Sequence, residues 1–244
     1  MLKPFSLAFV STAVVMVAGV AGAAPPAVAR DGIYSKAAIP IWANVGTADK
    51  PLKIVSPDER SSVSFWKDSS DGEIKLRLAG RLGQSTMTLN PAVNAELEWS
   101  PDSEAFFITA SDGGNVGNYH LLLYTDQNNS LVVRDFSPLI AKAFGNPVKC
   151  FDPEVPNIGG IGWQRGHGRL LLAAEIPPHS NCDSMGTFKA YQVDVVNMHI
   201  VDSYSQLAAK QRFGSLLGVE LRNADDSCAR DASSCYVTQL HQAP

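Results

Sequence analysis

The clearest pattern along the chain is an alternation of apolar and polar residues from Ile74 to Leu78, which carries Lys75 and Arg77 at the polar positions. A period of two residues predicts a β-strand with one buried face. Short apolar runs of the same kind recur through most of the chain. They predict strands at residues 52–55, 63–66, 74–78, 86–89, 95–99, 105–110, 119–125 and 131–135, and a further set between 157 and 204. The pattern indicates the all-β class.

Two short stretches have helical character instead. Residues 137–145 and 205–214 each begin with a serine that could cap a helix, run for about two turns and end at glycine. Pro138 follows the first serine, at a position where its missing N–H costs nothing. We therefore expect two short helices that connect groups of strands.

A turn motif precedes three of the apolar runs. Residues 56–60 read Ser-Pro-Asp-Glu-Arg, residues 99–103 read Trp-Ser-Pro-Asp-Ser, and residues 163–169 form a looser third copy that begins with tryptophan. Proline suits the first central position of a type I turn, and the adjacent aspartate can bond the local backbone. The motif predicts a repeat architecture, in which each copy is a turn followed by a buried strand.

These copies resemble the blade repeat of TolB-like (WD-type) β-propellers, which reads Trp-Ser-Pro-Asp-Gly before an apolar strand. The copies are degenerate, because Glu59, Ser103 and Gly168 interrupt the Asp-Gly pair. The resemblance implies a propeller-like stack of about three antiparallel blades and a partial fourth. Either an edge strand at 39–42 and a hairpin between 217–221 and 236–240 complete a small ring, or the sheets form an open stack. By analogy, the resemblance also implies an interaction role in the cell envelope.

The chain divides into three parts. Residues 1–29 read as a secretory signal peptide, with Lys3, an apolar run and small residues before the possible cleavage sites after Ala23 and Ala29. An uncleaved membrane anchor is the alternative, and no later segment could span a membrane. We expect residues 30–51 to form an N-terminal extended segment and residues 52–244 to form the repeat domain. The protein is then periplasmic or secreted.

Four cysteines lie in the exported part: Cys150, Cys182, Cys228 and Cys235. An even number in an oxidising compartment predicts disulfides. Of the three possible pairings, we favour Cys150–Cys182 with Cys228–Cys235. A metal site formed with His167 and His179 is the weaker alternative, because no Cys-x-x-Cys spacing occurs. We expect no metal and no cofactor.

Catalytic signatures are absent from the sequence, which has no Gly-x-Ser-x-Gly nucleophile motif. The weak catalytic candidates are His167, His179, Glu175 and Asp183. Glu96 and Glu98 share one face of a predicted strand and are expected to be solvated. The glycine-rich residues 157–163 lack the ending of a phosphate loop and favour a strand that passes close to its neighbours.

The four tryptophans divide into two pairs. Trp99 and Trp163 occupy the same position of the repeat, so we expect them to be buried equivalents. Trp42 and Trp66 lie outside that position and are the candidates for a ligand-binding surface.

These features predict an exported, non-catalytic binding module of the cell envelope whose partner is a protein. A hydrolase acting on sugar or peptide is one alternative, and an inhibitory or protective partner of another secreted protein is a second. The net charge of −4 gives no reason to expect nucleic acid as a partner. Open sheet edges would also allow a homo-oligomer.

The disulfide pairing is directly testable. Non-reducing peptide mapping of the exported protein by mass spectrometry should recover Cys150 linked to Cys182 and Cys228 linked to Cys235. Closing the short loop between Cys228 and Cys235 should stabilise the fold by about 2.5 kcal/mol on a chain-entropy estimate. Four free thiols in the exported protein would contradict the prediction.

Overall fold

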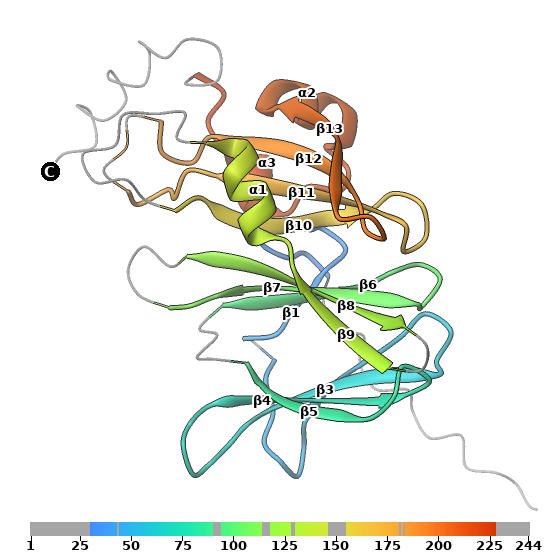
Figure 1. The fold of residues 1–244 in the computed structure, drawn as a ribbon. Helices are drawn as coiled ribbons and strands as arrows, with labels where there is room; N and C mark the ends of the chain where they lie inside the picture. Colours follow the sequence, from blue (N-terminus) through green and yellow to red (C-terminus); the bar gives the residue numbers. More distant parts are fainter. Residues whose placement is uncertain are drawn as a thin grey trace, which may run out of the picture.

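The computed structural model is an all-β, propeller-like stack of three antiparallel sheets with three short helices (Figure 1). The structure describes residues 30–42, 44–89, 94–113, 118–127, 130–145, 155–180, 182 and 184–227. Each sheet forms one blade. The predicted signal peptide and the cysteines 150, 228 and 235 lie outside the described residues.

The first blade contains β2 (Leu52–Val55), β3 (Ser61–Lys67), β4 (Ile74–Gly80) and β5 (Ser85–Leu89). The second contains β1 (Ile39–Pro40), β6 (Ala95–Trp99), β7 (Ala105–Ser111), β8 (Tyr119–Gln127) and β9 (Ser130–Asp135). The third contains β10 (Asn157–Trp163), β11 (Arg169–Glu175), β12 (Phe188–Asp194) and β13 (His199–Ser205). The helices are α1 (Ser137–Phe144), α2 (Gln206–Phe213) and α3 (Val219–Asn223). We call the side of the stack formed by β2, β6 and β10 the inner edge.

The three copies of the turn motif adopt matching geometry at the start of each blade. The N–H groups of Ser56, Ser100 and Gln164 donate to the carbonyl oxygen five residues later, at 2.9, 2.8 and 2.9 Å. Glu59 and Ser103 stand where the blade repeat that the motif resembles carries glycine, and their φ angles are +61° and +64°. These two residues therefore adopt a left-handed conformation that glycine accepts more readily.

The two predicted helices are present, but they are capped differently. Ser205 caps α2 as expected, since its side chain accepts from the N–H of Ala208. The prediction that Ser137 caps α1 is wrong. The N–H of Ser137 donates to the Asp135 carboxylate at 2.8 Å, and its hydroxyl accepts from the N–H of Leu121 at 2.9 Å. The serine thus ties the helix to β8 of the second blade.

Apolar side chains fill both interfaces between blades. One core cluster joins the first and second blades, and its largest fully buried members include Phe65, Leu76, Leu97 and Phe106. A second cluster joins the second and third blades, with Phe107, Leu121, Leu170 and Leu172. The helix α1 covers the outer part of this second interface through Phe136, Ile140 and Phe144.

The far faces of the first and third blades differ in polarity and in what covers them. On the third blade, Leu171, Ala173 and Ala190 form a cluster with Phe213 of α2 and Leu221 of α3. On the first blade, the corresponding positions carry half-buried Lys75 and exposed Arg77. A polar face needs no cover, whereas an apolar face does, and helices supply that cover here. Within the described residues, the stack thus ends in a covered apolar face on one side and a polar face on the other, and it does not close into a ring.

Glycines in β10 let the third blade approach its neighbours closely. A Cβ on Gly159 would meet the ring of Tyr34 at 2.1 Å, and a Cβ on Gly160 would meet the ring of Phe107 at 2.4 Å. The N–H of Gly160 donates to the Thr109 hydroxyl at 3.0 Å. The prediction that these glycines serve a close strand approach is confirmed.

The predictions for the N-terminal segment and for the end of the repeat domain have different outcomes. The expected edge strand near residue 39 is present as β1, which pairs with β6 at the edge of the second blade. The prediction that 217–221 forms one arm of a hairpin is wrong, because Val219–Asn223 is the helix α3. Residues 236–240 lie outside the described residues.

Two further expectations can be compared with the described part of the chain. No helix in it is long and apolar enough to cross a membrane. Cys182 is 2% exposed and is not a free thiol. Because the other three cysteines lie outside the described residues, both disulfide pairings stay predictions.

Substitution of Gly159 tests the close approach of β10. We expect Gly159→Ala to lower the free energy of unfolding by about 1–3 kcal/mol, the usual cost of overpacking, because the new methyl group overlaps the Tyr34 ring. Gly168→Ala is the matched control, since a Cβ there lies 3.5 Å from its nearest neighbour. Urea denaturation measures both, and equal stability of the two variants would contradict the packing argument.

Candidate functional site

The N-terminal segment runs along the inner edge and is held from both sides. The carbonyl oxygens of Gly32, Ile33 and Tyr34 accept hydrogen bonds from the N–H groups of Val219, Glu220 and Gly218, at 2.9, 3.0 and 2.7 Å. A Cβ on Gly218 would lie 2.3 Å from the carbonyl oxygen of Ile33. The first and last described parts of the chain therefore pair with each other at the inner edge.

The other side of this segment binds the carboxylate of Glu96 on β6. The N–H groups of Tyr34 and Ser35 donate to Oε1 at 3.1 and 3.3 Å, and the N–H of Ile33 donates to Oε2. A Cβ on Gly32 would lie 2.1 Å from the same carboxylate. Glu96 is completely buried, and burial raises its pKa to about 8 although the three N–H donors oppose the shift.

Two more carboxylates, the buried Glu175 and the half-buried Glu98, contact the same segment. The Tyr34 hydroxyl donates to Glu175 Oε2 at 2.6 Å, and the Ser35 hydroxyl donates to Glu98 Oε2. Burial raises the pKa of Glu175 to about 8. Burial also raises the pKa of Glu98 to about 7, against the hydrogen bonds from Ser35 and from the Trp163 N–H and against the charge of Arg30. Three glutamates thus face one short segment.

The expectation that Glu96 and Glu98 are solvated is wrong. Their alternation places them on one face of β6 as predicted, but that face looks onto the N-terminal segment and the third blade. Sequence periodicity identifies which side chains share a face and leaves open what covers it.

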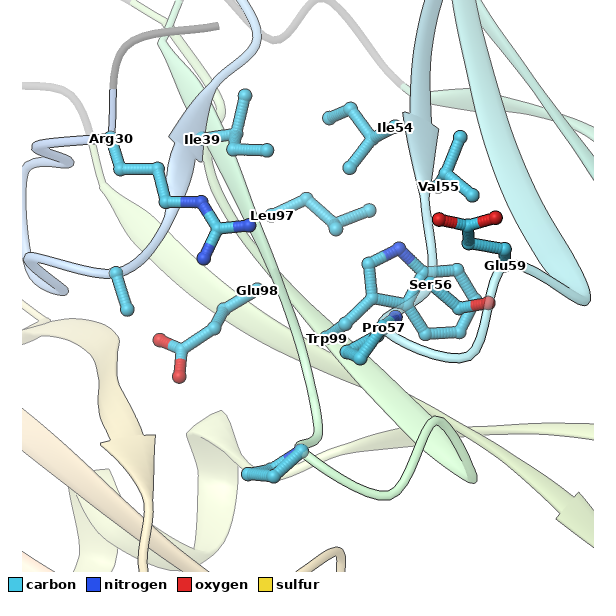
Figure 2. Close-up of a pocket in the computed structure, with 12 residues that line it drawn as sticks. Arg30, Ile39, Ile54, Val55, Ser56, Pro57, Glu59, Leu97, Glu98 and Trp99 are labelled. Carbon is cyan, nitrogen blue, oxygen red and sulfur yellow. The ribbon is translucent and has the colours of Figure 1, made fainter. Parts of the chain in front are cut away.

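A cavity of about 740 Å³ lies at the inner edge between the first and second blades (Figure 2). The N-terminal segment, the end of β2 with its turn, and β6 with its turn form its walls. Twelve residues line it: Arg30, Ala37, Ile39, Ile54, Val55, Ser56, Pro57, Glu59, Leu97, Glu98, Trp99 and Pro101. The volume lies within the range of about 300–1,000 Å³ usual for ligand pockets.

The walls of this cavity are mainly apolar, with charged groups toward its ends. Figure 2 shows Arg30 and Glu98 on one side of the apolar wall and Glu59 on the other. Val55 is 45% exposed, which is unusual for a valine beside a core strand. Such a surface favours an apolar ligand with a few polar groups.

The inner edges of the three blades are covered to different extents. The inner edge of β6 pairs with β1, and every residue of β10 is buried, with Tyr34 packed against Gly159. By contrast, β2 is the terminal strand of its sheet, and Val55 lines the cavity. The first blade therefore presents an open strand edge to the cavity.

The hydrogen-bond alternation shows which groups of β2 face outward. The N–H of Ser56 donates to Ser61, so Ser56 and then Ile54 form the hydrogen-bonded pairs with β3. Lys53 and Val55 occupy the alternate positions, whose main-chain groups point away from β3. Within the described residues, no hydrogen bond from another segment reaches the main chain of these two residues.

The sequence-predicted catalytic candidates are spread along the third blade. His167 precedes β11 and Glu175 ends it, so the seven-residue strand separates them by roughly 20 Å. His179 is exposed in the loop that follows Glu175. Asp183 lies outside the described residues. The structure thus brings no two of the described candidates together.

His167 instead connects two turns of the repeat. Its main-chain N–H and its Nδ1 lie 2.9 and 3.0 Å from Asp102 Oδ2 in the second blade. In the same way, the N–H of Asp58 in the first blade donates to the Ser103 hydroxyl at 3.0 Å. These contacts explain His167 as part of a chain of turn-to-turn contacts along one end of the stack.

The two pairs of tryptophans differ in burial. Trp99 and Trp163 are 9% and 8% exposed, which confirms them as buried equivalents. Both indole N–H groups are buried without a hydrogen-bond partner among the described residues, so this feature belongs to the repeat. Trp42 and Trp66 are half-buried, and the guanidinium of Arg77 lies 5.2 Å from the Trp66 ring centroid.

Sequence reasoning missed the cavity at the inner edge. Arg30 and Val55 lie outside the repeat motifs, and the alternation on β6 predicts Glu98 to be solvated. The sequence does carry one signal for this cavity. Glu98 and Trp99 stand directly before the turn motif of the second blade, and β2 ends directly before the turn motif of the first. Residues at equivalent ends of neighbouring blades meet in a stack.

The described residues contain no group of three or more histidine, cysteine, aspartate or glutamate side chains placed to hold a metal ion. Glu96 is fully engaged by backbone donors, and Glu175 is completely buried. Of these three glutamates, Glu98 lines the cavity, and it is half-buried. With a pKa near neutrality, it can accept or donate a hydrogen bond to a ligand there.

Comparison with protein-family models and with curated proteins finds no match. Among solved structures, the chain is similar to the β-propeller domain of the Trilobed protease from Pyrococcus furiosus, described as having an open velcro topology. The identity is 15%, the TM-score is 0.35, and the match covers 59% of this chain and 40% of that one. The propeller-like architecture of this chain is defined by its own three sheets.

The buried glutamates predict an unusual dependence of stability on pH. Glu96, Glu98 and Glu175 have pKa values of about 8, 7 and 8 in the fold, above the ordinary 4.5. Between these limits the folded state binds more protons than the unfolded state, so the stability that these three groups contribute is fully present below about pH 4.5 and is lost as pH rises through 7–8. The aspartates with lowered pKa values titrate at lower pH and leave this window unchanged.

Thermal unfolding between pH 5 and pH 9 should therefore show a melting temperature that decreases with rising pH. Glu96→Gln should reduce this slope, because it removes one of the three titrating groups and keeps an oxygen acceptor. Glu104→Gln, a change of the same type on the surface beside Arg81, should leave the slope unchanged. A melting temperature that rises steadily over this range would contradict the assignment.

Proposed function

We propose that this protein is an exported, non-catalytic binding module of the cell envelope, which holds an extended peptide segment of a partner protein in the inner-edge cavity. One observation carries the proposal: the main-chain groups of Lys53 and Val55 face outward from β2, and Val55 lines the cavity. An unpaired strand edge is a template for another strand.

Strand addition explains why this edge can serve as a binding site. A peptide that pairs with β2 would gain main-chain hydrogen bonds at Lys53 and Val55, while its alternate side chains face the cavity. Ile39, Ile54 and Trp99 offer apolar contacts to those side chains. The main chain supplies affinity and the cavity supplies selectivity.

The charged groups favour a particular peptide chemistry. Arg30 and Glu98 stand on one side of the apolar wall, so a polar or charged residue of the peptide fits there. The apolar wall suits branched or aromatic residues at the positions before it. We therefore expect an alternating apolar sequence with a polar residue at one end.

Export and a TolB-like role are the finer parts of this proposal. The apolar residues 5–23 and the small residues after them support a secretory signal, and the repeat motif of 56–60 and 99–103 supports kinship with TolB-like blades. Both support the proposal that the protein acts in the periplasm or outside the cell. An inhibitory or protective role toward a secreted protein is a special case of the same binding activity.

The hydrolase alternative lacks a comparable observation. The two carboxylates that line the cavity, Glu98 and Glu59, stand on different walls, and no histidine lines it. Incubating selected peptides with the protein and analysing them by mass spectrometry distinguishes the two functions. Intact peptides support binding, and cleavage that Glu98→Gln abolishes would support the hydrolase.

Substitution of the open strand edge tests the proposal. Peptides selected from a random displayed library on the intact protein should lose about tenfold or more in affinity for Val55→Pro, because proline removes the outward N–H. The fold should tolerate the change, since proline is accepted at sheet edges. Fluorescence titration measures the affinity and thermal unfolding checks the fold.

Val133→Pro is the matched control for this experiment. Val133 lies on the outer edge strand β9, is 43% exposed, and also occupies a position whose N–H points away from the sheet. It should leave peptide affinity unchanged. Equal weakening by the two variants, or no selected peptide that distinguishes them, would exclude strand addition at β2.

A further inference from the structure

A second pocket lies on the far face of the third blade, away from the inner edge. Its volume is about 330 Å³, and it is lined by Gln164, Arg165, Arg169, Gln192, Val201 and Arg212. Three of the six residues are arginines and two are glutamines, and none is acidic. A chain with a net charge of −4 thus gathers three guanidinium groups around one hollow.

Three separate parts of the blade bring these arginines together. Arg165 lies in the turn between β10 and β11, Arg169 begins β11, and Arg212 lies in the last turn of α2. Because α2 covers the far face of the third blade, its C-terminal end stands beside this pocket. The helix that completes the stack therefore also contributes a wall of the pocket.

Two of the arginines are held in place by neighbouring groups. The guanidinium of Arg212 lies 5.2 Å from the ring centroid of Tyr204 and 5.4 Å from that of Phe213. Stacking of this kind orients a guanidinium and leaves its N–H groups free to donate. Arg169 lies 3.7 Å from the carboxylate of Asp194, which fixes its direction without a close bidentate contact.

The charge of the pocket is only partly balanced. The carboxylate of Asp194 offsets the charge of Arg169. Hydrogen bonds from Tyr204 and Ser203 lower the pKa of Asp202 on β13, and the nearby charge of Arg212 lowers it further. Within the described residues, neither Arg165 nor Arg212 forms an ion pair. Clustered like charges repel one another, and a bound anion relieves that repulsion.

We propose that this pocket binds a phosphate group. Arginine presents several donors in a planar fork that matches phosphate oxygens, and the amides of Gln164 and Gln192 add neutral donors. A phosphate carries up to two charges, and its acceptor oxygens point in different directions. The donors of this pocket also come from different directions, because they lie on the turn, the strands and the helix. A planar carboxylate with one charge uses fewer of them.

Isothermal titration calorimetry with inorganic phosphate at constant ionic strength tests the site. The intact protein should bind phosphate saturably and more tightly than acetate. Arg165→Gln and Arg212→Gln should each weaken phosphate binding by about tenfold or more, because each removes a charged donor. Arg165 lies on an exposed turn, so its variant keeps the test valid if loss of the Arg212 stack destabilises α2.

Arg77→Gln is the matched control. Arg77 also stacks on an aromatic ring, that of Trp66, and its substitution removes the same charge from the first blade. It should leave phosphate binding unchanged. Absence of saturable binding, acetate binding as strong as phosphate binding, or equal weakening by Arg77→Gln would overturn the proposal.

Flotation with vesicles distinguishes the source of the phosphate. Vesicles of phosphatidylcholine containing phosphatidylglycerol should retain the protein, with loss of retention in Arg165→Gln and in excess inorganic phosphate, if the group belongs to a lipid headgroup. Phosphate binding in calorimetry without vesicle retention assigns the site to a soluble phosphate compound. Either vesicle result is compatible with the phosphate site. The calorimetric outcomes given above are the ones that would overturn it.

Discussion

The buried carboxylate of Glu96 organises the inner edge of this protein. It accepts the N–H groups of three consecutive residues, from Ile33 to Ser35, and so fixes the N-terminal segment against β6. Once fixed, that segment places Tyr34 against Gly159, and its carbonyl groups accept hydrogen bonds from the N–H groups at the start of α3. A buried carboxylate is costly unless its oxygens are bonded, and here the donors come from backbone that would otherwise be unpaired.

With this arrangement, the three described blades stack without closing into a ring. A closed propeller pairs its last blade with its first, whereas this chain covers the far face of its last blade with α2 and α3 and leaves polar side chains on the far face of its first. The N-terminal segment covers two of the three inner edges. The edge of β2 is the exception: the N-terminal segment does not pair with it, and the strand faces the cavity.

Local patterns in the sequence predicted the elements well. The alternation at 74–78, the turn motifs and the capped stretch at 205–214 depend on neighbouring residues, and the structure has strands, turns and a helix there. The burial of Glu96 could not be predicted, because its donors lie about sixty residues earlier in a segment with no repeat signal. Residues 217–221 were assigned to a strand by their apolar content, which a short helix shares.

The candidate site shows the same limit. The residue types suited to chemistry drew attention to His167 and Glu175, yet one ties two turns together and the other bonds a tyrosine. The cavity is made from ordinary residues, such as Ile39 and Val55, whose significance depends on which strand edge is left open. That property belongs to the assembled stack and has no counterpart in any single stretch of sequence.

The pairing of the two ends of the described chain has a consequence for how the protein is made. Asp31 and Arg222 form an ion pair across 191 residues of sequence, and Gly32 bonds Val219 beside it. The inner edge therefore cannot assemble until the chain has been synthesised through Arg222, and such distant contacts slow folding. Until then the N-terminal segment lacks the hydrogen bonds that Gly218, Val219 and Glu220 donate to it.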